Sequence, residues 1–155
     1  GNLWKESKGV DKHRRGIYTY LKRTSPYPSF ISFDAGSREI CLVRRLPSNT
    51  PLQALVTLND PVYLEAAIHL AKNHIDSTVE GSIKKMYSAA TYRTIDDAIL
   101  NELIALYQKA IEELKENESS LDNFFELGEK LDPKTASLSI VANAIMNLDE
   151  FLTHG

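Results

Sequence analysis

The chain lacks a cysteine pair: Cys41 is the one cysteine among 155 residues, so no disulfide forms within the chain. The compartment stays open on this ground, because a helical domain of this size folds in oxidising or reducing surroundings without bridges. Long apolar runs are missing as well. None approaches the ~18 residues that a bilayer-spanning helix needs, so the sequence predicts no transmembrane segment.

Motifs of catalysis and cofactor binding are also missing. The four histidines show none of the spacings of zinc sites and no C-x-x-C pair occurs, so we expect no metal ligands in this chain. Without C-x-x-C-H the chain attaches no c-type haem itself. It has neither a G-x-S-x-G element nor a glycine-rich phosphate loop. The sequence therefore names no catalytic residue and no cofactor, and it favours, without deciding it, a domain that is not an enzyme by itself.

The beginning of the chain, Gly-Asn-Leu-Trp, has no methionine and no basic-then-apolar leader. This start is typical of a domain taken from a longer protein, whose targeting signals would lie upstream. A length of 155 residues corresponds to one domain that buries roughly 68–70% of its unfolded surface. We therefore predict that residues 1–155 form a single domain from the C-terminal part of a longer protein.

Helix starts are readable from position 50 onward. Thr50-Pro51-Leu52-Gln53 combines a cap hydroxyl, a proline at the first helical position and a glutamine at the third, which is a capping box. Asp60-Pro61 and Asp132-Pro133 are also helix starts, and Thr94-Ile95-Asp96-Asp97 caps another helix. The predicted helices cover 51–59, 61–77, 79–92, the segment from this cap to 115, 121–130, and 133 to the C-terminus.

Apolar side chains recur at helical spacing within the longer segments, which indicates one buried side on each. On 61–77 these residues are Val62, Leu64, Ala67, Ile68, Ala71 and Ile75. On the helix that ends near 115 they are Ile99, Leu103, Leu106, Ala110 and Leu114. On the last helix they are Leu138, Val141, Ala142, Ile145, Leu148 and Phe151. The pattern predicts a bundle.

The first 49 residues differ from the helical part at 50–155. Glycine and proline interrupt them too closely for long helices. Two segments, 17–21 and 39–43, are rich in β-branched and aromatic residues and predict at most one short β pair, although helix fits the first nearly as well. We therefore predict a mainly α fold: a helical bundle of about five to six helices with a basic, irregular N-terminal layer.

The net charge of −3 hides an uneven distribution. Residues 12–60 carry eight Lys or Arg against three Asp or Glu, a net charge of +5, whereas residues 61–155 carry eight against sixteen, a net charge of −8. Such asymmetry marks an anionic partner of the basic part, or two parts that pack on each other and neutralise their charges. The basic residues are not clustered like a surface that tracks phosphates, which favours the second interpretation. Nucleic acid is not expected as a partner, because the chain is acidic overall and its charges are of mixed sign.

Arginines and aromatic residues gather in the N-terminal third. One interpretation is structural: arginine–carboxylate pairs fasten the irregular layer to the helices. The other is a site for an anion or a carbohydrate, joined by the N-termini of the first two helices, whose free N–H groups attract negative charge. The candidate binding residues are Arg14, Tyr18, Arg23, Asp34, Arg38, Arg44, Asn59 and Asp60.

Four segments resemble sequence elements of one family. Residues 14–24 resemble R-R-S-[IL]-Y-T-[FY]-W-K-R-T, and the segment at 34–39 resembles F-D-A-P-x-R-E. Residues 49–61 resemble T-N-T-P-L-Q-A-L-x-x-L-N-D-P, and 144–152 resemble A-[LI]-[LM]-N-x-x-E-F-[LI]. Together they resemble the C-terminal domain of unknown function of large planctomycete-type cytochrome c proteins, over nearly the whole chain. Departures are Leu21, Gly36 and the segment 89–94, which stands where the family has L-G-R-x-P-[TS].

The resemblance implies an exported, multidomain bacterial protein at the periplasm or cell surface, with any haem in an upstream domain. Our leading hypothesis is a non-catalytic interaction module that docks its upstream domains, or another partner, through the basic N-terminal layer. An exposed apolar patch around Leu3, Trp4 and Ile17 would support docking. The alternative is an anion- or carbohydrate-binding part of an active centre shared with an upstream domain.

Overall fold

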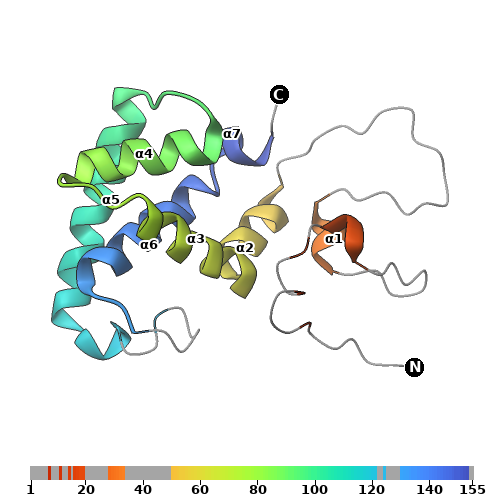
Figure 1. Ribbon diagram of the computed structural model, residues 1–155, viewed down its shortest axis with the longest axis horizontal. Coiled ribbons are helices and arrows are strands. Elements are labelled where there is room, and N and C mark those ends of the chain that lie inside the picture. Colours follow the sequence, from red (N-terminus) through yellow and green to blue (C-terminus); the bar gives the residue numbers. More distant parts are fainter. Residues whose placement is uncertain are drawn as a thin grey trace. The chain divides into compact units, whose positions relative to one another are not determined.

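The computed structural model describes residues 7, 11, 14, 16–19, 28–33, 50–121, 124 and 130–153. The chain forms two compact units, Gly1–Arg45 and Leu46–Gly155. Figure 1 shows the helices of both units. No strand is formed among the residues that the structure describes, so the predicted mainly α fold is confirmed.

The described part of Gly1–Arg45 consists of a 3-10 helix, η2 (Gly16–Tyr18), and a short α-helix, α1 (Pro28–Ser32). A Cβ on Gly16 would lie 3.0 Å from Cε1 of Phe30, so glycine lets η2 approach this ring. The first predicted strand is wrong where it is described, because Ile17 and Tyr18 belong to η2. Its last two residues and the second predicted strand, 39–43, lie outside the described residues.

The described helices of Leu46–Gly155 are α2 (Pro51–Asn59), α3 (Pro61–Asn73), α4 (Val79–Thr91), α5 (Asp97–Glu116), η3 (Glu118–Leu121), α6 (Pro133–Ile145) and α7 (Asp149–Leu152). Helix α6 packs against α2, α3, α4 and α5, and Figure 1 shows it among them. No helix of the described part is long and apolar enough to cross a membrane.

Helix α6 forms the centre of this unit and is buried on nearly all sides. Its apolar residues Leu138, Val141 and Ile145 lie in the main core cluster together with residues of α3, α4 and α5. The hydroxyls of Ser137 and Ser139 also enter the interior. They donate to the carbonyls of Pro133 and Thr135, at 2.7 and 2.8 Å, so neither is buried without a partner.

The predicted caps are confirmed. In the capping box, the Thr50 N–H donates to Gln53 Oε1 at 2.8 Å and the Gln53 N–H to Thr50 Oγ1 at 3.3 Å. Asp60 accepts from the Val62 N–H at 2.9 Å, and Asp132 accepts from the Thr135 N–H at 3.0 Å. Within the predicted cap at 94–97, Asp96 is the capping residue of α5.

Three predicted helices differ from the structure. Helix α3 ends at Asn73 rather than near 77, and Val62 and Ile75, predicted to be buried, are exposed. The last helix stops at Ile145, because the N–H groups of Asn147 and Leu148 bond carbonyls three residues back, and α7 then begins separately. In the segment 121–130, Leu121 closes η3, and most of the remainder lies outside the described residues.

Candidate functional site

Helix α2 buries polar side chains and exposes apolar ones, the reverse of an ordinary amphipathic helix. Its two buried side chains are polar: Gln53 is 2% exposed and Thr57 is fully buried. Its large apolar side chains are exposed, Leu52 at 54%, Leu55 at 57% and Leu58 at 43%. At about 100° per residue the three leucines cover an arc of roughly 120°, and Leu55 lies opposite the midpoint of the two buried residues. We call Leu52, Leu55 and Leu58 the leucine face.

A polar seam, made of Thr57, Asn143 and Asn147, joins α2 to the chain around α6. The Asn143 Nδ2 group donates to the Thr57 carbonyl at 2.9 Å in a buried position. This carbonyl has no helical N–H partner, because the residue four positions later is Pro61. Thr57 Oγ1 lies 2.9 Å from the Ala54 carbonyl and 3.0 Å from Asn147 Oδ1. Asn143 thus completes the hydrogen bonding that the proline interrupts.

The described side chains of α2 contribute nothing to the two apolar core clusters of Leu46–Gly155. Its apolar residues Ala54 and Val56 are only partly buried, whereas Thr57 is hydrogen-bonded to Asn143 and Asn147. The helix carries no charged residue over its nine positions. An uncharged helix that turns three leucines to solvent has the composition of an interface rather than of an ordinary surface helix.

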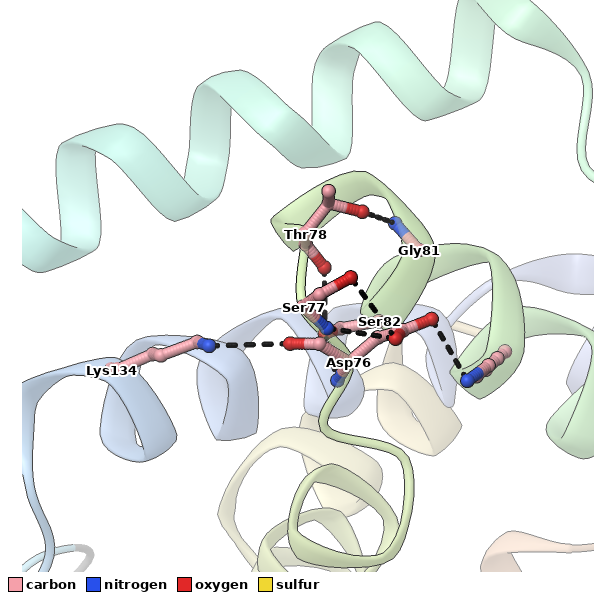
Figure 2. Close-up of polar contacts among 7 residues, drawn as sticks. Asp76, Ser77, Thr78, Gly81, Ser82 and Lys134 are labelled. Atoms are coloured by element: carbon pink, nitrogen blue, oxygen red, sulfur yellow. Dashed lines mark hydrogen bonds and ion pairs between the residues drawn. The ribbon is translucent and has the colours of Figure 1, made fainter.

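A second polar cluster lies where α3 turns into α4, and Figure 2 shows it. The Asp76 carboxylate accepts from the Ser77 N–H at 2.7 Å and pairs with Lys85 Nζ at 2.8 Å. The Lys85 hydrogen bond, followed by that of the Ser77 N–H, lowers the pKa of Asp76. The Asp76 N–H donates to Ser82 Oγ at 2.8 Å, and Lys134 Nζ reaches the Asp76 carbonyl at 3.4 Å. These groups satisfy one another and link α3, α4 and α6.

A third polar contact joins α4 to α7. The Tyr87 hydroxyl donates to Glu150 Oε2 at 2.5 Å, while its ring is part of the main core cluster. Burial of the phenol, and then its hydrogen bond to Glu150, raise the pKa of Tyr87 to about 12. This contact is structural, since it fastens the short C-terminal helix to the bundle.

Tyr92 closes α4 in the left-handed conformation, with φ of 58°, and its side chain is 88% exposed. Glycine is the usual residue at such a helix end. Asp96 then caps the next helix.

The structure places four of the eight predicted binding residues. Asn59 and Asp60 are helix-end residues: Asn59 Nδ2 donates to the Leu55 carbonyl at 2.8 Å, and Asp60 caps α3. In the other unit, Arg14 pairs with Asp11 at 2.6 Å in an exposed position, and Tyr18 is exposed. The other four, Arg23, Asp34, Arg38 and Arg44, lie outside the described residues.

The remaining expectations about a site have a mixed outcome. Ile17 is exposed, as a docking patch would require, whereas Leu3 and Trp4 lie outside the described residues. Within the described part, no three His, Cys, Asp or Glu side chains come together as metal ligands would. The sequence reasoning missed the leucine face and the polar seam. The signal was present in 51–59, where the leucines recur every three residues and the polar Gln53 and Thr57 occupy the opposite side.

Comparison with known proteins adds one finding. A family model described as "PSD1: Protein of unknown function (DUF1553)" matches residues 1–107, well over half of the chain. Neither the curated proteins nor the solved structures contain a match. The matched residues include the leucine face. The two α6-side members of the polar seam, Asn143 and Asn147, lie beyond them.

Proposed function

The chain belongs to the PSD1 family of proteins of unknown function (DUF1553), and we propose that it is a non-catalytic interaction module. The family assignment confirms the resemblance to the domain of planctomycete-type cytochrome c proteins. In our proposal the module docks another domain of the same exported, multidomain protein through the leucine face of α2. The observation that carries this proposal is the orientation of α2, which buries Gln53 and Thr57 and exposes three leucines.

The size of the leucine face favours a covalently linked partner over a free one. Burying the exposed part of three half-exposed leucines stabilises a complex by about 3 kcal/mol. Association of two free proteins costs roughly 4–15 kcal/mol in lost translational and rotational freedom. A domain of the same polypeptide is present at an effective concentration on the order of 1 mM. This is roughly a thousandfold above a free partner at micromolar concentration and favours docking of the linked domain by about 4 kcal/mol over that free partner. A second copy of the chain would need about 800 Å² of buried surface on each partner.

The chemistry of α2 also restricts what the partner presents. Because the helix carries no charge, an ionic group placed against the leucine face would lose its water without gaining a counter-charge. We therefore expect an uncharged apolar surface, such as one side of an amphipathic helix. A periplasmic or cell-surface location, and haem in an upstream domain if the protein carries any, belong to the same proposal.

Photo-crosslinking in the complete protein tests the docking. A benzoyl-phenylalanine placed at position 55 is expected to react with a peptide of another domain. The matched control carries the same group at position 108, an exposed position of α5, and is expected to give no such product. Products that join position 55 only to residues 1–155 or to a second copy, or no product at all, would refute the proposal.

A further inference from the structure

The way α2 is fastened differs from that of α3, α4, α5 and α6, the longer helices that the structure describes in its unit. Helix α3 buries Leu64, Ala67 and Ile68, so lifting it would expose apolar surface. Lifting α2 would expose its two buried side chains, both polar, and the partly buried Ala54 and Val56. The hydrogen bonds of Thr57 to Asn143 and Asn147 would be exchanged for hydrogen bonds with water. Elements with few buried apolar contacts are those that open locally at low free energy.

The connection between α2 and α3 is suited to such an opening. Asp60 ends α2 and caps α3, and its ψ of 127° is extended rather than helical. Pro61 then prevents the two helices from sharing a hydrogen-bonded turn at this point. A change in the backbone dihedral angles of Asp60 would therefore move α2 relative to α3 about a single residue. On the other side, the long-range hydrogen bonds that hold α2 come from Asn143 and Asn147, 86 and 90 residues along the chain from their partner.

We propose that α2 opens as a separate unit from the bundle, by breaking the polar seam while the core formed by α3, α4, α5 and α6 stays intact. Asn143 is the positioning residue that holds the helix in its closed state. The inference rests on the proposed function, since the helix that opens is the one that presents the leucine face. Docking would then be regulated by the fraction of molecules in which α2 is closed and the leucine face is held in place.

Hydrogen–deuterium exchange on the 155-residue chain tests this opening without any partner. Amides of α2 are expected to exchange at least about a hundredfold faster than those of α6. Low urea concentrations should not change the exchange rate of α2, because a local opening exposes little surface. Asn143→Ala is expected to raise exchange in α2 by about tenfold, because it leaves the Thr57 carbonyl without a partner. The matched control Asn101→Ala, at an exposed position of α5, is expected to leave it unchanged.

A core substitution separates local opening from global unfolding. Leu103 lies in the main core cluster, so Leu103→Ala is expected to raise exchange in α5 and α6 by about a hundredfold. Exchange in α2 should not change, because its opening leaves that core intact. Equal acceleration in α2 and α6 would overturn the inference, and so would α2 amides as protected as those of α6. Either result leaves the crosslinking test of docking independent.

Discussion

Helices α2 and α6 pack against each other but differ in how their buried polar groups are hydrogen-bonded. Helix α6 is buried on nearly all sides, and its serines donate to carbonyls of their own helix. Helix α2 turns its leucines outward, and its Thr57 carbonyl depends on Asn143 of the other helix. Buried polar groups can therefore be satisfied in two ways, by hydrogen bonds within the same helix or by hydrogen bonds to a neighbouring helix. The dependent helix is the one that carries the exposed apolar surface.

The largest contrast is expected between matched leucine substitutions on the two helices. Leu138→Ala on α6 should lower the free energy of unfolding by about 3 kcal/mol, because the side chain is fully buried and leaves a cavity. Leu55→Ala on α2 should change it by less than about 0.5 kcal/mol. Urea unfolding of both variants measures this difference. Similar losses for the two would mean that the leucine face is packed within the chain itself.

A pH dependence is expected where α4 meets α7. The pKa of Tyr87 is raised to about 12, so the folded state keeps a proton that the unfolded state has lost above about pH 10. Stability from this group is complete below pH 10 and falls by about 1.4 kcal/mol per pH unit up to pH 12. Tyr87→Phe should lack this component in unfolding experiments across that range. If the two proteins lose stability in parallel, folding does not raise the pKa of Tyr87.

The polar seam should contribute less to the free energy of unfolding than the apolar core does. Asn143→Ala is expected to cost about 1–2 kcal/mol, since a buried carbonyl is left unsatisfied. Asn101→Ala, at an exposed position of a neighbouring helix, should stay within about 0.5 kcal/mol of the wild type. Thermal or urea unfolding gives both values. Equal stability of the two variants would remove Asn143 from the account of how α2 is held.

The smallest expected effect is an increase in stability. Tyr92→Gly should stabilise the protein by roughly 0.5–1 kcal/mol, because glycine adopts the left-handed conformation at this helix end without steric cost. Its matched control is Arg93→Gly, which is expected to bring no gain because Arg93 does not have a positive φ. Melting temperatures of both variants give the comparison. A loss of stability in Tyr92→Gly would show that the exposed ring makes contacts that outweigh the backbone strain.

Helix starts were predictable from the sequence because their causes are local. Thr50 with Gln53, Asp60 with Pro61 and Asp132 with Pro133 each act over three residues or fewer, and all three starts are confirmed. Helix ends were less predictable. Apolar spacing continues through Ile75 although α3 ends at Asn73, where the Asp76 cluster begins the turn into α4.

The orientation of α2 was not predictable in the same way. Its two sides are evident in 51–59, but the usual expectation puts leucines inside and glutamine and threonine outside. The opposite orientation depends on hydrogen bonds to Asn143 and Asn147, which no local pattern connects with Thr57. The binding residues predicted in the N-terminal third remain a prediction, because half of the eight lie outside the described residues.

The most direct test of the central claim compares hydrogen exchange of α2 in the complete protein with that in the 155-residue chain. If another domain docks on the leucine face, the amides of residues 52–59 should be at least tenfold more protected in the complete protein, as about 1.4 kcal/mol of added stability would produce. Amides of α5 should exchange equally in both. Identical exchange of α2 in the two proteins would contradict the claim that this helix is a docking element.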